Sequence, residues 1–214
     1  MNHTAEIKVT GHGLVSAMPD AIRVELTVVS QKLDYPQTLA SLNARVSAIG
    51  EAVTRAGTRE TVFTKSYTIT EAWSDPYDKE KRQFQGYEAT QEMRVTIPLD
   101  NALLGQIING VSECKADPSI RIVFMVKDVD ALKKAARIHA VHRAKEAAQD
   151  LADASGLQLS SIRSIDFSSS RANADNGLCV SVFAQLDGPS APEIEPDVVS
   201  HEEVVHMVWI ANPK

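Results

Sequence analysis

The chain has 214 residues, a length that suits one large domain or two small ones. Hydrophobic residues make up 43% of the sequence, enough for a substantial core, and the net charge is −6. That charge argues against a nucleic-acid-binding protein, because phosphate contacts require a basic face. Charged residues interrupt every apolar stretch within about 18 residues, so no transmembrane helix is predicted.

The N-terminal sequence and the cysteines bear on the compartment. MNHTAEIKV lacks the basic region and the apolar stretch of a secretory signal. The sequence as written therefore predicts a cytoplasmic protein, or a periplasmic one whose signal has been removed. Cys114 and Cys179 lie far apart and form no CxxC pattern. A disulfide between them is one interpretation, but two reduced thiols are favoured in a chain of this size.

The first half of the chain predicts strands around one long helix. Residues 7–15 have β character, a turn follows at Met18-Pro19-Asp20, and alternating polarity over 22–28 indicates a half-buried strand. We therefore expect the first two strands to form a hairpin. A stripe of apolar residues predicts a helix over 36–57, which Gly57 ends.

Two further strands, 62–73 and 87–98, flank a protruding loop over 71–87. The loop contains the charged run 78–82 and four aromatic residues: Trp73, Tyr77, Phe84 and Tyr87. A solvated loop is the simpler interpretation. The alternative is a contact arm, because exposed aromatic residues flanked by charge suit interfaces.

The second half of the chain repeats this alternation of helices and strands. Asp100 is a candidate N-cap for a helix over 102–113. The predicted elements that follow are a buried strand over 120–126, a helix over 129–156 that ends at Gly156, and strands over 162–170, 179–186 and 201–210. A proline-rich loop over 187–200 precedes the last strand, because three prolines exclude regular structure there.

The helix over 129–156 is the element around which we expect the chain to be organised. Its apolar positions recur at spacings of three and four and form one stripe, mostly of alanine: Leu132, Ala136, Ala140, Ala144, Ala147, Leu151 and Ala154. Ala152 falls on the opposite side. Small side chains let a helix axis lie close to its partner, so we expect the stripe to pack on a β-sheet.

The order of elements predicts an α+β fold in a single domain over 1–214. Strand, long helix and strand occur over 22–73 and again over 120–170, two βαβ-like repeats. We expect one mixed, largely antiparallel sheet with the long helices packed on one face.

Several motifs, in this order and spacing, resemble the SIMPL domain family. They are Val9-Thr10-Gly11-His12-Gly13, Met18-Pro19-Asp20-Ala21, Ala56-Gly57, Pro76-Tyr77, Gly86-Tyr87-Glu88-Ala89 and the alanine-rich helix before Gly156. The resemblance covers nearly the whole chain. It implies a bacterial protein of unclear biochemistry, periplasmic or associated with the outer membrane, in some members linked to oxidative stress and assembled into ring-like oligomers. The family has no established catalytic residues.

The segment from His201 to His206, HEEVVH, invites comparison with zinc proteases. Their motif needs two histidines four residues apart on one face of a helix, with glutamate as the base. Here the spacing is five, which separates the rings by about 140° on a helix and places them on opposite faces of a strand. The surrounding valines favour a strand. Polar residues on an edge or a solvent face, Glu202 and Glu203 among them, are the simpler interpretation.

Other candidate residues are also best explained by structure. His139 and His142 share one side of a helix, but no third metal ligand is indicated, so we expect solvated side chains. Gly11-His12-Gly13 lacks the third glycine and the following helix of a phosphate loop, and its glycines are expected to mark a bulge or a close strand contact. The serines at 168–170 lack a GxSxG elbow and indicate a polar strand end. Arg137 and Arg143 border the alanine stripe, where they pair with carboxylates on the sheet or, as we expect, extend into water.

The sequence therefore predicts no catalytic, cofactor-binding or metal-binding residues and no cofactor. We expect a non-enzymatic SIMPL-like protein that acts through oligomeric assembly or binding, with a role in the stress response or the cell envelope, as the resemblance implies. The expected partner is a second copy of the chain, in a homo-oligomer. A small-ligand-binding protein and a hydrolase are the alternatives; the first requires a closed pocket and the second a cluster of convergent catalytic groups.

Overall fold

The structure is a computed structural model that describes residues 4–74, 83–167, 179–183 and 197–214. Its contacts divide the chain into two compact units. The terminal unit comprises residues 1–19, 126–179 and 197–214, and the central unit comprises residues 20–125 and 180–196. The prediction of a single domain over 1–214 stays a prediction. The α+β class is confirmed, because both units combine antiparallel strands with helices.

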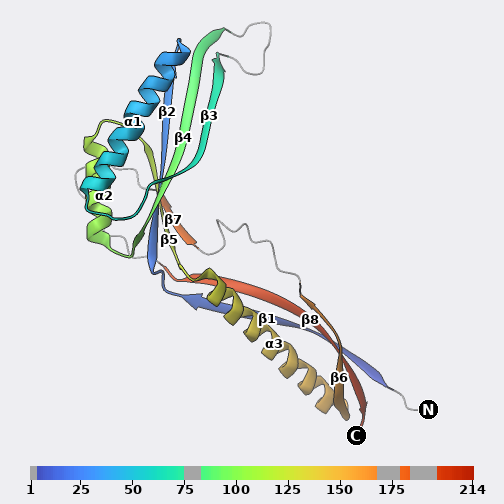
Figure 1. Cartoon of the computed structure of the whole chain (residues 1–214). Helices are drawn as coiled ribbons and strands as arrows, with labels where there is room; N and C mark the ends of the chain where they lie inside the picture. The colour runs from blue at the N-terminus through green and yellow to red at the C-terminus, as the bar shows by residue number, and fades with distance from the viewer. Residues whose placement is uncertain (1–3, 75–82, 168–178, 184–196) are drawn as a thin grey trace. The chain divides into compact units, whose positions relative to one another are not determined.

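The central unit is a five-stranded sheet with two helices (Figure 1). Its strands run in the order β3-β4-β2-β5-β7. The elements are β2 (Ala21–Lys32), α1 (Tyr35–Arg55), β3 (Phe63–Trp73), β4 (Phe84–Pro98), α2 (Asn101–Glu113), β5 (Ser119–Met125) and β7 (Cys179–Phe183). Apolar residues of α1 and α2 pack with one face of β2, β4 and β5 in a single core. Asp100 caps α2 as predicted, because its carboxylate accepts from Ala102 N and Leu103 N.

The terminal unit is a three-stranded antiparallel sheet with one long helix. Its elements are β1 (Ala5–Ala17), α3 (Val129–Ala154), β6 (Leu157–Phe167) and β8 (Val199–Pro213), with β8 between the other two strands. Gly156, at a φ of 70°, ends α3 as predicted. The chain then enters β6 at once, five residues before the predicted start. Cys114 of the central unit carries a free thiol, and the prediction of two reduced thiols stays a prediction.

The prediction of one sheet is wrong, and so is that of an N-terminal hairpin. β1 pairs with β8, whereas β2 pairs with β4 and β5, in a separate sheet. Alternating polarity identifies a strand but not its partner, and here the partner of β1 lies almost two hundred residues away. The first βαβ repeat is confirmed: β4 runs antiparallel to both β2 and β3, so the strands on either side of α1 are parallel. The second is wrong, because β5 and β6 belong to different sheets.

Both predicted loops are shorter than expected. β3 extends to Trp73 and β4 begins at Phe84, so strands occupy part of 71–87. The charged run 78–82 and Tyr77 lie outside the described residues. β8 likewise begins within the predicted loop 187–200. Residues 187–196 of that loop lie outside the described part of the chain. The serines at 168–170 also lie outside it.

In the second half of helix α3, the buried residues differ from those of the predicted stripe. The buried positions follow a strict spacing of four: Leu132, Ala136, Ala140, Ala144, Ala148 and Ala152. Leu151 and Ala154 are exposed and Ala147 is half-buried, whereas Ala152, predicted on the far side, is fully buried. A row of residues four apart rotates by about 40° per step around the helix. It can therefore follow a twisted sheet, which a straight stripe cannot.

This row makes a testable prediction about the C-terminal half of α3. Ala152→Leu is expected to overpack the interface with β1 and β8 and to cost about 1–3 kcal/mol of unfolding free energy. The control Ala154→Leu adds the same atoms at an exposed position and should change stability by less than about 0.5 kcal/mol. Urea unfolding followed by circular dichroism measures both. Equal shifts of the two midpoints would mean that the burial of this half of α3 is misassigned.

Candidate functional site

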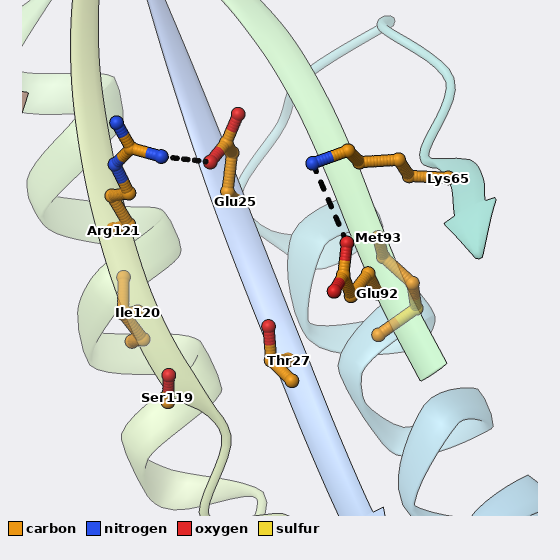
Figure 2. Close-up of a pocket in the computed structure, with 8 residues that line it drawn as sticks. All are labelled: Glu25, Thr27, Lys65, Glu92, Met93, Ser119, Ile120 and Arg121. Atoms are coloured by element: carbon orange, nitrogen blue, oxygen red, sulfur yellow. Dashed lines mark hydrogen bonds and ion pairs between the residues drawn. The ribbon is translucent and has the colours of Figure 1, made fainter. Parts of the chain in front are cut away.

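The face of the central sheet opposite α1 and α2 carries a polar hollow (Figure 2). The hollow encloses about 260 Å³ and is lined by side chains of four adjacent strands: Glu25, Thr27, Lys65, Glu92, Met93, Ser119, Ile120 and Arg121. Arg121 Nη1 on β5 donates to Glu25 Oε2 on β2 at 3.3 Å, and Lys65 Nζ on β3 lies 3.4 Å from Glu92 Oε2 on β4. The hollow is therefore bordered by two separate ion pairs.

The strand register explains how these four charges meet. Arg121 lies directly opposite Glu25, and the next pair on the same face of the sheet is Ser119 with Thr27. Thr27 in turn lies opposite Glu92. A row of two hydroxyl groups and a carboxylate thus crosses three strands beside the Arg121–Glu25 pair.

Lys65 reaches the hollow because of an irregularity in β3. The pairing of β3 with β4 shifts between Thr64 and Ser66, so Lys65 is the additional residue of a β-bulge. A bulge redirects a side chain and occurs preferentially beside functional sites. Here it brings the ammonium group of an end strand next to Glu92.

The terminal unit contains a second polar cluster, buried between α3 and β8. His201 Nε2 and Glu203 Oε1 lie 3.1 Å apart, and their side chains are only 6% and 4% exposed. Arg137 Nη2 of α3 lies 3.7 Å from the same carboxylate oxygen, with its guanidinium group 4.6 Å above the centre of the Phe167 ring. Within the described residues, Glu203 Oε2 has no hydrogen-bond partner. Such a cluster needs its charges compensated to persist in the core.

An exposed aromatic surface lies where α1 begins beside β3 and β4. Four rings contact one another edge to face, with centres 5.2–5.4 Å apart: Tyr35, Tyr87, Phe84 and Trp73. Leu33, which is 73% exposed, lies beside Gly86, the residue before Tyr87: a Cβ on Gly86 would lie 2.8 Å from Leu33 Cα. These five residues are called the aromatic surface below.

The model of the family described as "SIMPL: Protein of unknown function (DUF541)" matches residues 7–209. The chain belongs to the SIMPL family. The resemblance seen in the sequence is confirmed, and no established activity comes with membership.

Known structures and curated proteins add little to the assignment of this SIMPL chain. An uncharacterised conserved protein from Listeria innocua has 10% identity and a TM-score of 0.24, with 94% of this chain and 92% of that chain covered. A hydrolase from Listeria innocua has 12% identity and a TM-score of 0.21, with the same shares covered. No curated protein matches the sequence.

The structure separates the two histidines of HEEVVH in this SIMPL chain, as the strand prediction required. His201 is buried beneath α3, whereas His206 is exposed on the other face, where its Nδ1 lies 2.9 Å from Thr10 Oγ1. The expectation of an edge or a solvent face is wrong for His201 and Glu203, because β8 is the central strand of its sheet. The sequence could not reveal this, because each face of β8 carries both valine and polar residues.

The other candidate residues of the SIMPL chain, two histidines and two arginines, lie on helix α3. His139 and His142 are exposed on α3. Arg143 pairs with Glu146 on its own helix. Arg137 pairs with Glu203 on the sheet, which was the alternative to the expected extension into water. The described residues contain no group of three or more histidine, cysteine or acidic side chains suited to a metal. No described helix is long and apolar enough to cross a membrane.

Only one titratable group in the described part of the SIMPL chain has a clearly shifted pKa. Gln149 donates to the carboxylate of Asp153, and Lys214 both donates to it and attracts it electrostatically, which lowers the pKa of Asp153. Asp153 lies at the exposed end of α3, far along the helix from Arg137. This interaction therefore holds Lys214 at the C-terminal end of α3.

Sequence reasoning missed the hollow of the SIMPL chain altogether. Glu25, Glu92 and Arg121 occupy the polar positions of alternating strands and look like ordinary solvent-facing residues. The one local signal is Lys65, where the alternation of β3 changes phase. In a sequence, such a change in the alternation of polar and apolar residues looks the same as the end of a strand. Only the pairing with the neighbouring strand distinguishes the two.

Proposed function

We propose that the protein is a non-enzymatic assembly protein that forms a symmetric homodimer through its aromatic surface. The observation that carries the proposal is the exposure of this surface: Leu33 is 73%, Tyr35 43% and Phe84 42% accessible. Aromatic residues are enriched at protein interfaces, because they combine a large apolar area with a polar group that can remain in water.

A second copy of the chain is the occupant that the surrounding charges favour. Exposed Lys32 and Asp34 flank Leu33, and exposed Glu71 lies on the neighbouring strand β3. In a twofold dimer each patch faces the same patch of the second copy. A patch with both signs of charge can therefore pair its lysine with the carboxylates of the second copy. β3 is also an end strand of its sheet. Its outer edge, beside the aromatic surface, can therefore enlarge the contact between the two copies.

The non-enzymatic part of the proposal is supported by the position of the histidine–glutamate pair. His201 and Glu203 resemble an acid–base pair in composition, but α3 covers both side chains. A substrate would have to displace the helix to reach them. Arg137 also holds the carboxylate as a structural partner, which favours a role in stability.

The test of assembly is the molar mass in solution. Light scattering coupled to gel filtration should give about twice the 23.3 kDa of one chain. The double variant Leu33→Lys/Phe84→Lys should give the mass of a single chain, because a symmetric contact would place the new charges close to one another. The control Leu14→Lys changes another exposed leucine, on β1, and should leave the dimer intact.

Two outcomes would contradict the proposal. A monomeric wild-type protein over a wide concentration range would reject self-association. An oligomer that survives Leu33→Lys/Phe84→Lys, in a protein still folded by circular dichroism, would assign the interface to another surface.

A further inference from the structure

We propose that β6 and the neighbouring side of α3 bind an acidic, partly apolar peptide segment of another protein as an additional strand. Among the described strands, β6 pairs with β8 on one side only, so it forms an edge of the terminal sheet (Figure 1). An edge strand presents free backbone N–H and C=O groups, with which an extended peptide can pair. The proposal goes beyond dimer formation, since the aromatic surface belongs to the central unit.

Three apolar side chains of β6 are exposed on the face of the terminal sheet that carries α3. Ile162, Ile165 and Phe167 are 44%, 55% and 37% accessible. Residues directly opposite each other on neighbouring strands share one face of the sheet. The residues opposite these three on β8 are all buried in the core beneath α3: Trp209, Met207 and Val205. The apolar face of the sheet therefore continues from the core onto β6 and remains open there.

The width of α3 explains this opening. The alanines of α3 pack with β1 and β8, whereas on β6 only Leu157 and Leu159, at the start of the strand, join the same core. A helix with its side chains is about 10 Å wide, and strands lie about 4.8 Å apart. One helix therefore covers about two strands, which leaves the later part of β6 uncovered.

The side of α3 that faces β6 is basic. Arg137 identifies this side, because its guanidinium group lies 4.6 Å from the centre of the Phe167 ring. Residues four apart are neighbours on one side of a helix, and those of this side are Lys133, Arg137, Val141, Lys145 and Gln149.

These charges favour an acidic ligand. Arg137 pairs with Glu203, but its side chain is still 48% exposed. Among the described residues, Lys133 and Lys145 have no carboxylate partner. The first acid in the same row is Asp153 at the end of the helix, where Lys214 and Gln149 already donate to it. Carboxylates of a bound peptide would therefore meet cations along the uncovered part of β6.

The irregular pairing of β6 favours a short peptide over a second copy of the chain. The register of β6 with β8 shifts between Leu159 and Ser161 and again between Ile162 and Ser164. Such bulges bend an edge strand and hinder its pairing with another long strand. A short peptide is flexible enough to follow the bend. Because alternate side chains of a strand share one face, the ligand should carry apolar residues at alternate positions, with acidic residues on either side of them.

The experiment measures the binding of labelled heptapeptides to the full chain by fluorescence polarisation. The probe DTITVTE places two acidic and two apolar side chains on one face of a strand, and we expect a Kd of about 100 µM. The probe KTITVTK exchanges the acids for lysines and should bind about tenfold more weakly. A third probe is DTITVTE with N-methyl groups on its third and fourth residues, which removes N–H donors on both edges of the strand. It should also bind about tenfold more weakly, because an added strand depends on backbone hydrogen bonds.

Two variants test the apolar and the basic part of the surface. Ile165→Glu adds a charge of the same sign as the ligand, and Lys145→Glu reverses the charge of the helix side. Each should weaken the binding of DTITVTE about fivefold or more, and Lys145→Glu should strengthen the binding of KTITVTK. The controls Leu14→Glu and Lys8→Glu make the same changes at exposed positions of β1, on the opposite face of the sheet. They should leave the affinities unchanged.

Every outcome supports or overturns the proposal. It is supported if Ile165→Glu and Lys145→Glu weaken the binding of DTITVTE and the two controls do not. No binding up to about 20-fold above the expected Kd, equally tight binding of KTITVTK, or equally tight binding of the N-methylated probe would overturn it. A lower molar mass of Ile165→Glu in light scattering would assign β6 to a second copy of the chain instead. The double variant Leu33→Lys/Phe84→Lys should bind DTITVTE like the wild type, so this result does not depend on the dimer.

Discussion

Gly13→Ala is expected to destabilise the terminal unit by about 3 kcal/mol or more. Overpacking of a core usually costs about 1–3 kcal/mol. Here a Cβ on Gly13 would lie 1.9 Å from the carbonyl oxygen of Ala136 and 2.5 Å from the backbone nitrogen of Ala140. The obstruction is helix backbone, which cannot rotate away as a side chain can, so α3 must move off the sheet. Gly11 has the same relation to α3 one turn further on, with Ala140 O at 2.0 Å.

The measurement can report on the terminal unit alone. Trp209 lies in the core beneath α3 and Trp73 in the central unit, so a Trp73→Phe background leaves Trp209 as the fluorescent probe. Urea unfolding followed by this emission should show a lower midpoint for Gly13→Ala.

A glycine in the central unit provides the control with the opposite expected sign. Gly50 lies inside helix α1, and a Cβ there would meet nothing within 4 Å. Gly50→Ala should therefore stabilise the central unit by about 0.5–1 kcal/mol, because alanine has the higher helix propensity. The emission of Trp73, which lies in the same unit, reports this change in a Trp209→Phe background. A Gly13→Ala midpoint as high as that of the parent would mean that α3 does not lie this close to β1.

Arg137→Met is expected to destabilise the terminal unit by about 1–3 kcal/mol. Methionine keeps the apolar stem beside Phe167 but removes the charge that lies 3.7 Å from Glu203. The Glu203 side chain is only 4% exposed, and a buried carboxylate that loses its cation costs several kcal/mol. We expect the lower part of that range, because Arg137 is half exposed and His201 remains beside the carboxylate.

A double variant distinguishes the lost charge from lost packing. Glu203→Gln in the Arg137→Met background removes the uncompensated charge and should recover at least about 1 kcal/mol. Arg143→Met is the matched control, since Arg143 makes an exposed pair with Glu146 on the same helix, and its effect should stay within about 0.5 kcal/mol. If Arg137→Met and Arg143→Met have equal unfolding midpoints, the buried cluster is not held by Arg137.

The sequence by itself determined the secondary structure and the family. Alternating polarity located β2, apolar stripes located α1 and α3, and Asp100 and Gly156 marked helix ends at the residues where the structure has them. These features depend on the backbone preferences and hydrogen bonds of neighbouring residues, which a single sequence displays. The glycines of β1 were also predicted to mark a close contact, although the contact is with a helix and not with a strand.

Only the tertiary structure decided which strands pair, which side of α3 is buried in its second half, and which charges are buried. Each of these depends on residues distant in the chain. β1 pairs with β8 because both pack beneath α3, and that helix must bury a row of residues four apart to follow their twist. Glu203 is buried because the same helix covers it, and the hollow exists because four strands and a bulge place Arg121, Glu25, Lys65 and Glu92 together. Local periodicity carries no information about such long-range packing, which is why the sequence predicted the elements and not the sites.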